Sequence, residues 1–440
     1  MTSFLINSIR SQKAPALMLI AALGVAAPFA AYAASQKKTT TASSTPQTPD
    51  GPRKLKFDPK TLVWPSPPNV ARVRWMDYFA GAKIDYSAPA ATKTKASWMD
   101  RLAGAQSDQE KVNVKTFPFQ LIGPFGIAID SKNKVYVADQ KVGAIFIFNT
   151  DTHDTELIRN GYEAHFGWIN CLAMDDDDRL FVSDGKLRHV LVFNPKHEQE
   201  GQITEGLVDP VGLAIDTANR FLYVVDTQQD QVIVYDADTY KLLRRIGTGG
   251  KNHTLTGQGD FGAPQGVAVD ADGNVYVTDT LNDRVEIFDA DGNFISTFGK
   301  NGDGPGFFER PKGIAVDGDG HIWVADEVQD RLQVFDKDGH LLTYVGYKHG
   351  ELPGQFQALV GVAVDKQNRV FTTEQFPGRL QEFQYISDAQ AEAEKQHQAE
   401  EGAKRAAQHK AVTPTSTTKP AQQPAAAAPQ SGTAAPKASQ

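Results

Sequence analysis

Cysteine is nearly absent from this chain of 440 residues, because Cys171 is the only one. A single thiol cannot form an internal disulfide, and its isolation excludes cysteine-rich zinc sites and a Cys-x-x-Cys-His site for haem attachment. Cys171 lies within the apolar stretch WINCLAM, where a buried and unreactive thiol is the expected state. The sequence therefore predicts no thiol or disulfide chemistry.

Long apolar runs are equally scarce, and the one that stands out lies within residues 1–33. There Arg10 and Lys13 precede the run APALMLIAALGVAAPFA, and the small residues AYA come just before Ala34. This order is typical of a cleaved secretory signal peptide. An uncleaved anchor is the alternative, because the run approaches the ~20 residues that span a bilayer. Pro28 and the Ala-x-Ala site favour cleavage, so we expect an exported chain, periplasmic or extracellular, without a transmembrane span.

Positive charge is scarce in the region of the repeats described below. Residues 121–386 contain 23 basic and 41 acidic residues, and the whole chain has a net charge of −8. A nucleic-acid partner requires a basic face that neutralises phosphates. The composition and the expected export therefore exclude nucleic acid as a partner, and favour an envelope or extracellular protein or a small ligand.

Six copies of one pattern fill the middle of the chain. The clearest copy is GVAVDADGNVYVTDTLNDRVEIFD at 266–289, and the aspartate that follows the first apolar run recurs at positions 130, 175, 216, 270, 317 and 365. The copies lie near residues 123–149, 168–194, 209–236, 263–289, 310–336 and 358–384. Their spacing is 41 to 54 residues. A four-stranded propeller blade needs about 40–50 residues, so each copy fits one blade.

Each copy reads as a short antiparallel meander. In the fourth copy, Val267 and Val269 alternate with other residues, as do Val275 and Val277, which is the period-two pattern of a half-buried strand. Gly273 in the turn DADGN can adopt the positive φ of a tight hairpin. Segments such as NFISTFG at 293–299 add an outer strand. The pattern predicts four-stranded antiparallel blades.

The last copy has no outer strand of its own, whereas ARVRWMDYFAG at 71–81 looks like an outer strand without a blade. We therefore predict an all-β fold over residues 70–386. It is a six-bladed β-propeller whose ring is closed by the N-terminal strand, an arrangement that leaves no open sheet edge.

The flanking segments have other compositions. Residues 34–69 are expected to be disordered or extended, and SWMDRLAGA, with Ser97 as its cap, predicts one helical turn between 82 and 118. Residues 387–411 predict a polar helix. Residues 412–440, rich in Pro and Ala, predict a disordered tail.

The repeat resembles the NHL repeat. Its motif is Pro-x-Gly-hydrophobic-Ala-hydrophobic-Asp, followed by Val-Tyr-Val-Ala/Thr-Asp and Arg-Val-x-hydrophobic-Phe-Asp, over roughly residues 120–386. Copy two departs from the motif because WINCLAM has neither the proline nor the glycine, and copy six has TTE in place of Val-x-Asp. The resemblance, extended by the entry sequence WPSPPNVARVRW, implies an exported bacterial six-bladed propeller. It does not imply one activity, because propellers host many.

Candidate binding residues follow from the meander, in which the start of strand one and the end of strand two meet at one mouth of the ring. The positions just before strand one are Phe125, Asn170, Val211, Gln265, Lys312 and Val360, of which Asn170, Gln265 and Lys312 are polar. Strand two ends at Asp139, Asp184, Asp226, Asp279, Asp326 and Glu374. Six carboxylates suggest a cation site. One acid per repeat, with an arginine five residues on at 284, 331 and 379, favours blade architecture.

Two enzyme classes were tested against these positions. A zinc-dependent peptidyl-hydroxyglycine lyase, a relative of NHL propellers, would need histidines in the middle of Pro-x-Gly, and none occurs there. A calcium-dependent lactonase of the gluconolactonase type would need a Glu, an Asn and an Asp that converge on the axis, for which Asn170 and Glu374 are suggestive.

The prediction is an exported, non-catalytic propeller that acts as a protein- or ligand-binding scaffold in the cell envelope. No catalytic residue, metal ligand or cofactor is assigned to it. The lactonase, with calcium, is the alternative.

Overall fold

The computed structural model describes residues 58–82, 119–161, 164–249, 253–346 and 349–387, with scattered residues between 390 and 404. The predicted signal peptide, the segment 34–57, the predicted helical turn at 97–105 and the tail 412–440 lie outside the described residues. Between 390 and 404, where a polar helix was expected, the described residues are helical. No helix in the described part of the chain is long and apolar enough to cross a membrane.

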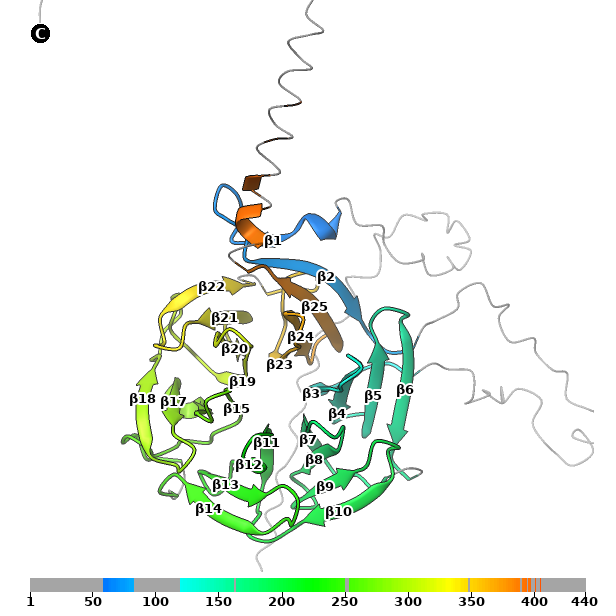
Figure 1. Ribbon diagram of the computed structural model, residues 1–440, viewed down its shortest axis with the longest axis vertical. Helices are drawn as coiled ribbons and strands as arrows, with labels where there is room; N and C mark the ends of the chain where they lie inside the picture. Colours follow the sequence, from blue (N-terminus) through cyan, green and yellow to red (C-terminus); the bar gives the residue numbers. More distant parts are fainter. Residues whose placement is uncertain are drawn as a thin grey trace, which may run out of the picture. The chain divides into compact units, whose positions relative to one another are not determined.

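Six antiparallel sheets surround one axis and form a six-bladed β-propeller (Figure 1). Blade one holds β3 (Pro124–Ile129), β4 (Val135–Asp139), β5 (Ala144–Asn149) and β6 (Asp154–Arg159); blade two holds β7 (Ile169–Met174), β8 (Leu180–Asp184), β9 (His189–Phe193) and β10 (Gln199–Ile203). Blade three holds β11 (Pro210–Asp216), β12 (Phe221–Asp226), β13 (Gln231–Asp236) and β14 (Leu242–Ile246). Blade four holds β15 (Val267–Val269), β16 (Val275–Asp279), β17 (Arg284–Phe288) and β18 (Phe294–Phe298), with the 3-10 turn η3 (Thr280–Asn282) after β16. Blade five holds β19 (Pro311–Val316), β20 (Ile322–Asp326), β21 (Arg331–Phe335) and β22 (Leu341–Val345).

Blade six is completed from the front of the chain, as the sequence predicts. Its strands β23 (Leu359–Val364), β24 (Arg369–Glu374) and β25 (Arg379–Tyr385) are followed outward by β2 (Val73–Phe79) and β1 (Val63–Trp64), with the 3-10 turn η1 (Pro59–Thr61) before β1. β2 pairs with β25 from Val73↔Tyr385 to Phe79↔Leu380. The indole N–H of Trp75 donates to Gln381 Oε1 at 2.9 Å. The prediction of closure by an N-terminal strand is confirmed.

The core lies between the blades and not within them. A single sheet has two apolar faces, and each neighbouring blade covers one of them. Between blades five and six, Trp75, Trp323 and Phe383 belong to one buried cluster, and five similar clusters occupy the other blade interfaces. All residues of β4, β8, β16 and β20 are buried. Each fully buried Val, Leu, Ile or Phe contributes about 1.5–3 kcal/mol, so the ring is stabilised by its interfaces.

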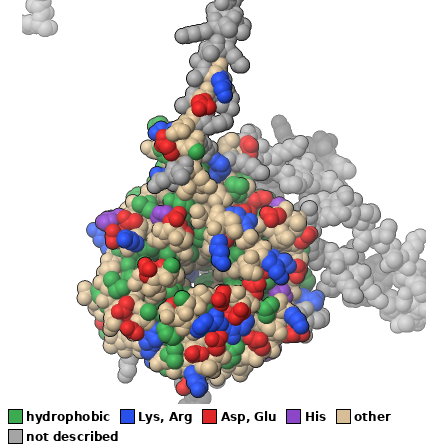
Figure 2. Space-filling view, viewed as in Figure 1, with side chains coloured by type: hydrophobic (Ala, Val, Ile, Leu, Met, Phe, Trp, Pro, Cys, Tyr) green, Lys and Arg blue, Asp and Glu red, His purple; other side chains and the backbone are tan. Residues whose placement is uncertain are grey.

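The glycine of the Pro-x-Gly motif, retained in copy six where Leu359 takes the place of proline, allows neighbouring blades to approach closely at the axis. A Cβ on Gly266 would lie 2.3 Å from Lys312 O of blade five, and one on Gly361 would lie 2.3 Å from Phe125 O of blade one. Hydroxyl groups bridge the same seams, as where Thr278 Oγ1 donates to Lys312 O at 2.7 Å. The motif therefore sets how tightly the inner strands pack around the axis. Figure 2 shows acidic and basic side chains spread over the visible face of the ring.

Candidate functional site

The mouth face is the side of the ring where the first strand of each blade begins and the second strand ends. The turns between second and third strands and the links between blades lie on this face. The residues that the sequence places just before strand one line two pockets at the axis: Phe125, Asn170, Val211 and Gln265 line the larger, and Phe125, Gln265, Lys312 and Val360 line the smaller. The three predicted polar residues Asn170, Gln265 and Lys312 therefore all lie at the axis.

The larger pocket has a volume of about 430 Å³. Its lining also includes residues that the sequence reasoning did not single out: Gln140, Trp168, Gly185, Lys186 and Asp209. Trp168 is 46% exposed, which is unusual for so large an apolar side chain. The pocket therefore combines aromatic surface, amide groups and two charged groups of opposite sign, the mixture that orients a bound ligand.

Asn170 is held in a fixed orientation at this pocket. Its Oδ1 accepts a hydrogen bond from Gln140 Nε2 at 2.8 Å, and its Nδ2 donates to Pro210 O at 2.9 Å. Asn170 is only 4% exposed, and it joins blades one, two and three across the mouth. In contrast, Gln140 Oε1 and the side-chain amide of Gln265 make no hydrogen bond to the described residues, so they are available to a ligand.

Asp209 is a half-buried carboxylate at the edge of the same pocket. Burial and the neighbouring Asp226 carboxylate raise the pKa of Asp209, while Arg188 acts in the opposite direction. Within the described part of the chain, no group donates a hydrogen bond to this carboxylate. Because this carboxylate is only half-buried and accepts from no described group, it can accept a hydrogen bond from a donor group on a ligand.

Lys312 lies on the opposite side of the axis and is already paired. Its Nζ lies 2.8 Å from Glu327 Oε1 and 5.7 Å from the centroid of the Phe125 ring. Arg310 approaches the other oxygen of Glu327 at 3.8 Å. Glu327 therefore interacts with both of these cations, and Lys312 is not free for a ligand.

The six strand-ending carboxylates do not line either pocket. Asp139, Asp184, Asp226, Asp279, Asp326 and Glu374 are all 0% exposed. Each accepts backbone N–H groups from its own mouth-face loops; Asp139 Oδ2, for example, accepts from Ile122 N at 2.6 Å and Gly123 N at 2.9 Å. These bonds replace the water that the N–H groups lose on burial. Their geometry is that of blade architecture, and their lone pairs face protein donors.

Arginine pairing occurs at two of the three positions where the spacing suggested it. Arg284 Nε donates to Asp279 at 2.8 Å, and Arg379 Nε donates to Glu374 at 2.7 Å. Arg331 does not bond Asp326; it donates to Gln329 Oε1 at 2.7 Å instead. Burial raises the pKa of Glu374 to about 7, although the hydrogen bond from Arg379 acts to lower it. Glu374 therefore lies in a closed network away from the axis, so the lactonase-like set of Glu, Asn and Asp is not assembled around it.

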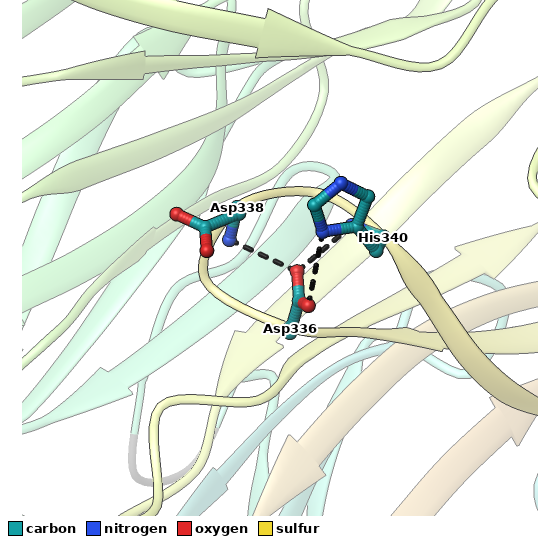
Figure 3. Close-up of side chains that lie close together, drawn as sticks. All are labelled: Asp336, Asp338 and His340. Carbon is teal, nitrogen blue, oxygen red and sulfur yellow. Dashed lines mark hydrogen bonds and ion pairs between the residues drawn. The ribbon is translucent and has the colours of Figure 1, made fainter.

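Among the described residues, two side-chain groups with metal-ligand character lie in turns of the opposite face: Asp175, Asp176 and Asp177 between β7 and β8, and Asp336, Asp338 and His340 between β21 and β22 (Figure 3). Asp336 Oδ1 accepts from the backbone N of Asp338 at 3.0 Å and of His340 at 2.8 Å, and the His340 ring bonds Asp336 Oδ2 at 3.1 Å. The hairpin after Asp270 has the same bonds, with Asn274 in the place of His340. His340 is thus one of several donors that complete a recurring turn, and no metal is assigned to it.

Two family models match separate stretches of the chain. The model described as SMP-30/Gluconolactonase/LRE-like region matches residues 168–299, and the NHL repeat model matches residues 308–335. The fold and the axial site define a six-bladed β-propeller. This propeller contains a match to the NHL repeat at residues 308–335, and the predicted resemblance to that repeat is confirmed.

Individual proteins are similar over limited regions. NHL repeat-containing protein 2 of Gallus gallus is 24% identical over 144 residues, which are 29% of this chain and 20% of that protein, so the match spans a fifth of the relative's length. A structural genomics protein of unknown function from Bacteroides thetaiotaomicron superposes with a TM-score of 0.51 at 18% identity, over 60% of this chain and 70% of that one. A gluconolactonase from Xanthomonas campestris gives a TM-score of 0.46 at 18% identity, over 61% and 90%. The Bacteroides likeness supports the fold alone.

Proposed function

We propose that this protein is an exported, non-catalytic propeller that binds a partner or a small ligand at its mouth face, in the cell envelope. The observation that carries the proposal is the larger axial pocket, where Trp168 and Asp209 depart from the repeat. The equivalent positions in the other blades are Gly123, Ala263, Arg310 and Ala358. A blade does not need an exposed indole or an unbonded half-buried carboxylate, and both are groups that binding would satisfy.

The lining of this pocket favours binding over catalysis. It contains one carboxylate, Asp209, and one amine, Lys186, and its described residues include no histidine, serine or threonine. Nucleophilic catalysis needs a nucleophile beside a base, and general acid–base catalysis needs a group placed for proton transfer. Cys171 lines the smaller pocket, but burial raises the pKa of its thiol and keeps it in the unreactive form.

The export part of the proposal rests on the sequence of residues 1–33. It is tested by expressing the full chain in a bacterium, isolating the exported fraction and sequencing the N-terminus of the protein. We expect a chain that begins at Ala34. Recovery of a chain that begins at Met1, in the cytoplasm, would remove the envelope from the proposal without affecting the site.

Binding at the mouth is tested by site-specific photo-crosslinking. A benzoylphenylalanine residue replaces Trp168 in one protein and Leu342 in a control, since Leu342 is a similarly exposed apolar residue (50%) on the outer strand β22. After irradiation in the producing cells, mass spectrometry identifies adducts. We expect an adduct that forms from position 168 and not from position 342. Equal adducts at both positions, or none at 168, would contradict the proposal.

The lactonase remains a second candidate because the SMP-30/Gluconolactonase/LRE-like model matches residues 168–299, which include Asn170 and Asp209. Carboxylate and amide oxygens are ligands that calcium prefers. Calorimetry with millimolar calcium, and hydrolysis of a sugar lactone in its presence, separate the two candidates. Heat and hydrolysis that are both lost in Asp209→Asn would favour the lactonase; the absence of both would favour the binding platform.

A further inference from the structure

Large apolar side chains are exposed on the mouth face and not in the turns of the opposite face. Ile122, Trp168, Leu281, Val328, Leu352 and Phe376 are each 46–55% exposed in mouth-face turns and links. The other exposed large hydrophobic residues lie at the outer rim, as Leu243 and Ile295 do, or in the N-terminal links. Within the described residues, the turns of the opposite face expose none. Such a concentration on one face marks an interaction surface.

Part of this face forms a continuous strip across blades six, one and two, which we call the mouth strip: Phe376, Ile122, Lys141, Trp168 and Lys186. The ideal Cβ of Gly378, two residues after Phe376, lies 3.2 Å from Ile122 Cα. The Lys141 ammonium lies 4.9 Å from the centroid of the Phe376 ring. Gln140, which precedes Lys141, lines the larger pocket together with Trp168 and Lys186. The strip therefore runs from an apolar patch at the seam of blades six and one to the pocket.

The exposed charged side chains of this sector are mainly positive, and the half-buried Asp209 carboxylate lies beside them in the larger pocket. The turns after β24, β4 and β8 contain the exposed cations Lys141, Lys186 and Arg188, and their acids are the buried strand-ending Glu374, Asp139 and Asp184. In the described part of the chain, Lys186 and Arg188 form no ion pair. The corresponding turns of blades four and five differ, because the partly exposed acids Asp283 and Glu327 occur there; Asp230 and Asp330 are buried and bond His253 and His349. A ligand that fits the mouth strip therefore carries negative charge.

Hydrogen-bonding groups lie between the apolar and charged parts of the strip. Gln140 Oε1 can accept a hydrogen bond, and the side-chain amide of Gln265 can both donate and accept one. Neither group forms a hydrogen bond with the described residues. A peptide backbone offers complementary N–H and C=O groups at regular spacing. In an extended peptide, side chains alternate between two faces, so apolar and acidic residues can meet different parts of the strip.

From these observations we propose that the mouth strip docks an acidic, apolar segment of a partner polypeptide. The partner's apolar side chains pack on Trp168 and on the Phe376–Ile122 patch, and its carboxylates pair with Lys141, Lys186 and Arg188. The inference rests on the proposed function and narrows it, because it names the chemical class of the partner and the sector of the face that holds it.

The test uses a short fluorescein-labelled peptide in which Phe and Leu alternate with Asp and Glu, and measures its binding to the full chain by fluorescence anisotropy. Two matched peptides have Lys in place of the acids, or Gly in place of the apolar residues. We expect both to bind at least about tenfold more weakly. Raising the salt concentration should weaken the binding of the acidic peptide, because salt screens exposed ion pairs.

Variants of the protein locate the binding. Trp168→Ala and Lys186→Glu should each weaken binding about tenfold or more, as truncation of an interface anchor or reversal of a steering charge does. Leu342→Ala, on the outer strand, and Lys337→Glu, in a turn of the opposite face, should leave it unchanged. All four side chains are replaced at exposed or outer positions, and equal melting temperatures establish that each variant is folded.

Several results would overturn the proposal. If the lysine peptide binds as tightly as the acidic peptide, the partner does not need negative charge. If Leu342→Ala and Lys337→Glu weaken binding as much as Trp168→Ala and Lys186→Glu do, the peptide does not bind at the mouth strip. Binding that appears only after deletion of residues 84–117 would assign the strip to the chain's own segment, which leaves and rejoins the mouth face where Ala82 N donates to Phe119 O at 2.8 Å. Self-association that Phe376→Ser abolishes would assign it to a second copy. If crosslinking from position 168 succeeds while the peptides fail, the proposed function survives and this inference does not.

Discussion

Removing the indole of Trp75 should open the ring at its closing strand. The side chain is 5% exposed and belongs to the cluster between blades five and six, where it packs with Trp323 and Phe383. Truncation of a buried aromatic residue costs about 3–5 kcal/mol through lost transfer energy and the remaining cavity. Its hydrogen bond adds little to this loss, because Gln381 Oε1 keeps a second donor in Gly354 N at 3.0 Å. We therefore expect Trp75→Ala to lower the free energy of unfolding by about 3–5 kcal/mol.

Tyr78→Ala on the same strand is the matched control, because Tyr78 is 49% exposed. Surface substitutions usually change stability by less than about 0.5 kcal/mol. Urea unfolding of the full chain, followed by far-ultraviolet circular dichroism, gives the transition midpoints of both variants. The reasoning predicts a clearly lower midpoint for Trp75→Ala alone. Equal midpoints for the two variants would refute it, and with it the role of β2 in closing the ring.

Three further outcomes are expected. Burial raises the pKa of Glu382 to about 7; Arg369 opposes this, and Asp77 across the β2–β25 pair adds to it. The folded state therefore holds the Glu382 proton more tightly than the unfolded state, in which the pKa of this carboxyl has its ordinary value of 4.5. The contribution of this proton to the free energy of unfolding is fully present below about pH 4.5, and it is lost as the pH rises through about 7. Glu382→Gln should therefore flatten the fall of unfolding free energy between about pH 5 and pH 8; an unchanged slope in urea titrations would argue against it. Gly361→Ala should destabilise the protein by about 1–3 kcal/mol, because its Cβ would meet Phe125 O and Thr373 Oγ1 at 2.3 Å, whereas Gly318→Ala, with nothing within 4 Å, should be tolerated. The reverse order of melting temperatures would contradict the close packing at the axis. Asp326→Asn should lower the free energy of unfolding by about 1–3 kcal/mol, because it weakens the hydrogen bonds that the carboxylate accepts from Glu309 N at 2.8 Å and Gln329 N at 3.1 Å. A melting temperature equal to that of the wild type would show that these bonds are dispensable.

The blades were predictable because their information is local. Alternation such as Val275–Val277 and a turn residue such as Gly273 (φ +85°) fix strands and hairpins within one copy. Closure was predictable for a different reason, since a copy without an outer strand and an outer strand without a copy have one simple solution. The pairing of β1 with β2 was not foreseen, because two residues, Val63 and Trp64, carry no periodic signal.

The candidate site was only partly predictable, and the pleat of the strands explains the difference. Side chains alternate in direction along a strand, so where Asp139 turns into its loop, the next residue, Gln140, turns to the mouth. The same step leads from Asp326 to Glu327, which reaches Lys312. Sequence reasoning chose the more conspicuous carboxylates, whereas two of the residues that follow them, Gln140 and Gly185, line the larger pocket.

Trp168 and Asp209 required another kind of reasoning. The sequence does contain a signal near Trp168, because copy two has Ile-Asn-Cys in place of the usual Pro-x-Gly directly after it. A departure from a repeat marks a position that the fold does not dictate. What the sequence cannot give is that Trp168 and Asp209, from successive blades, share one pocket, because that depends on how the blades are packed.

The most direct measurement asks whether partner binding depends on the residues of the mouth strip or on the buried strand-ending carboxylates. A benzoylphenylalanine crosslinker replaces Ile122, an exposed apolar residue of the mouth strip, in three proteins: otherwise wild type, Trp168→Ala and Asp326→Asn. The yield of adduct per folded protein is recorded beside the melting temperature. The account predicts that Trp168→Ala loses the adduct and keeps its melting temperature, whereas Asp326→Asn melts earlier and keeps the adduct. The opposite pattern would contradict it.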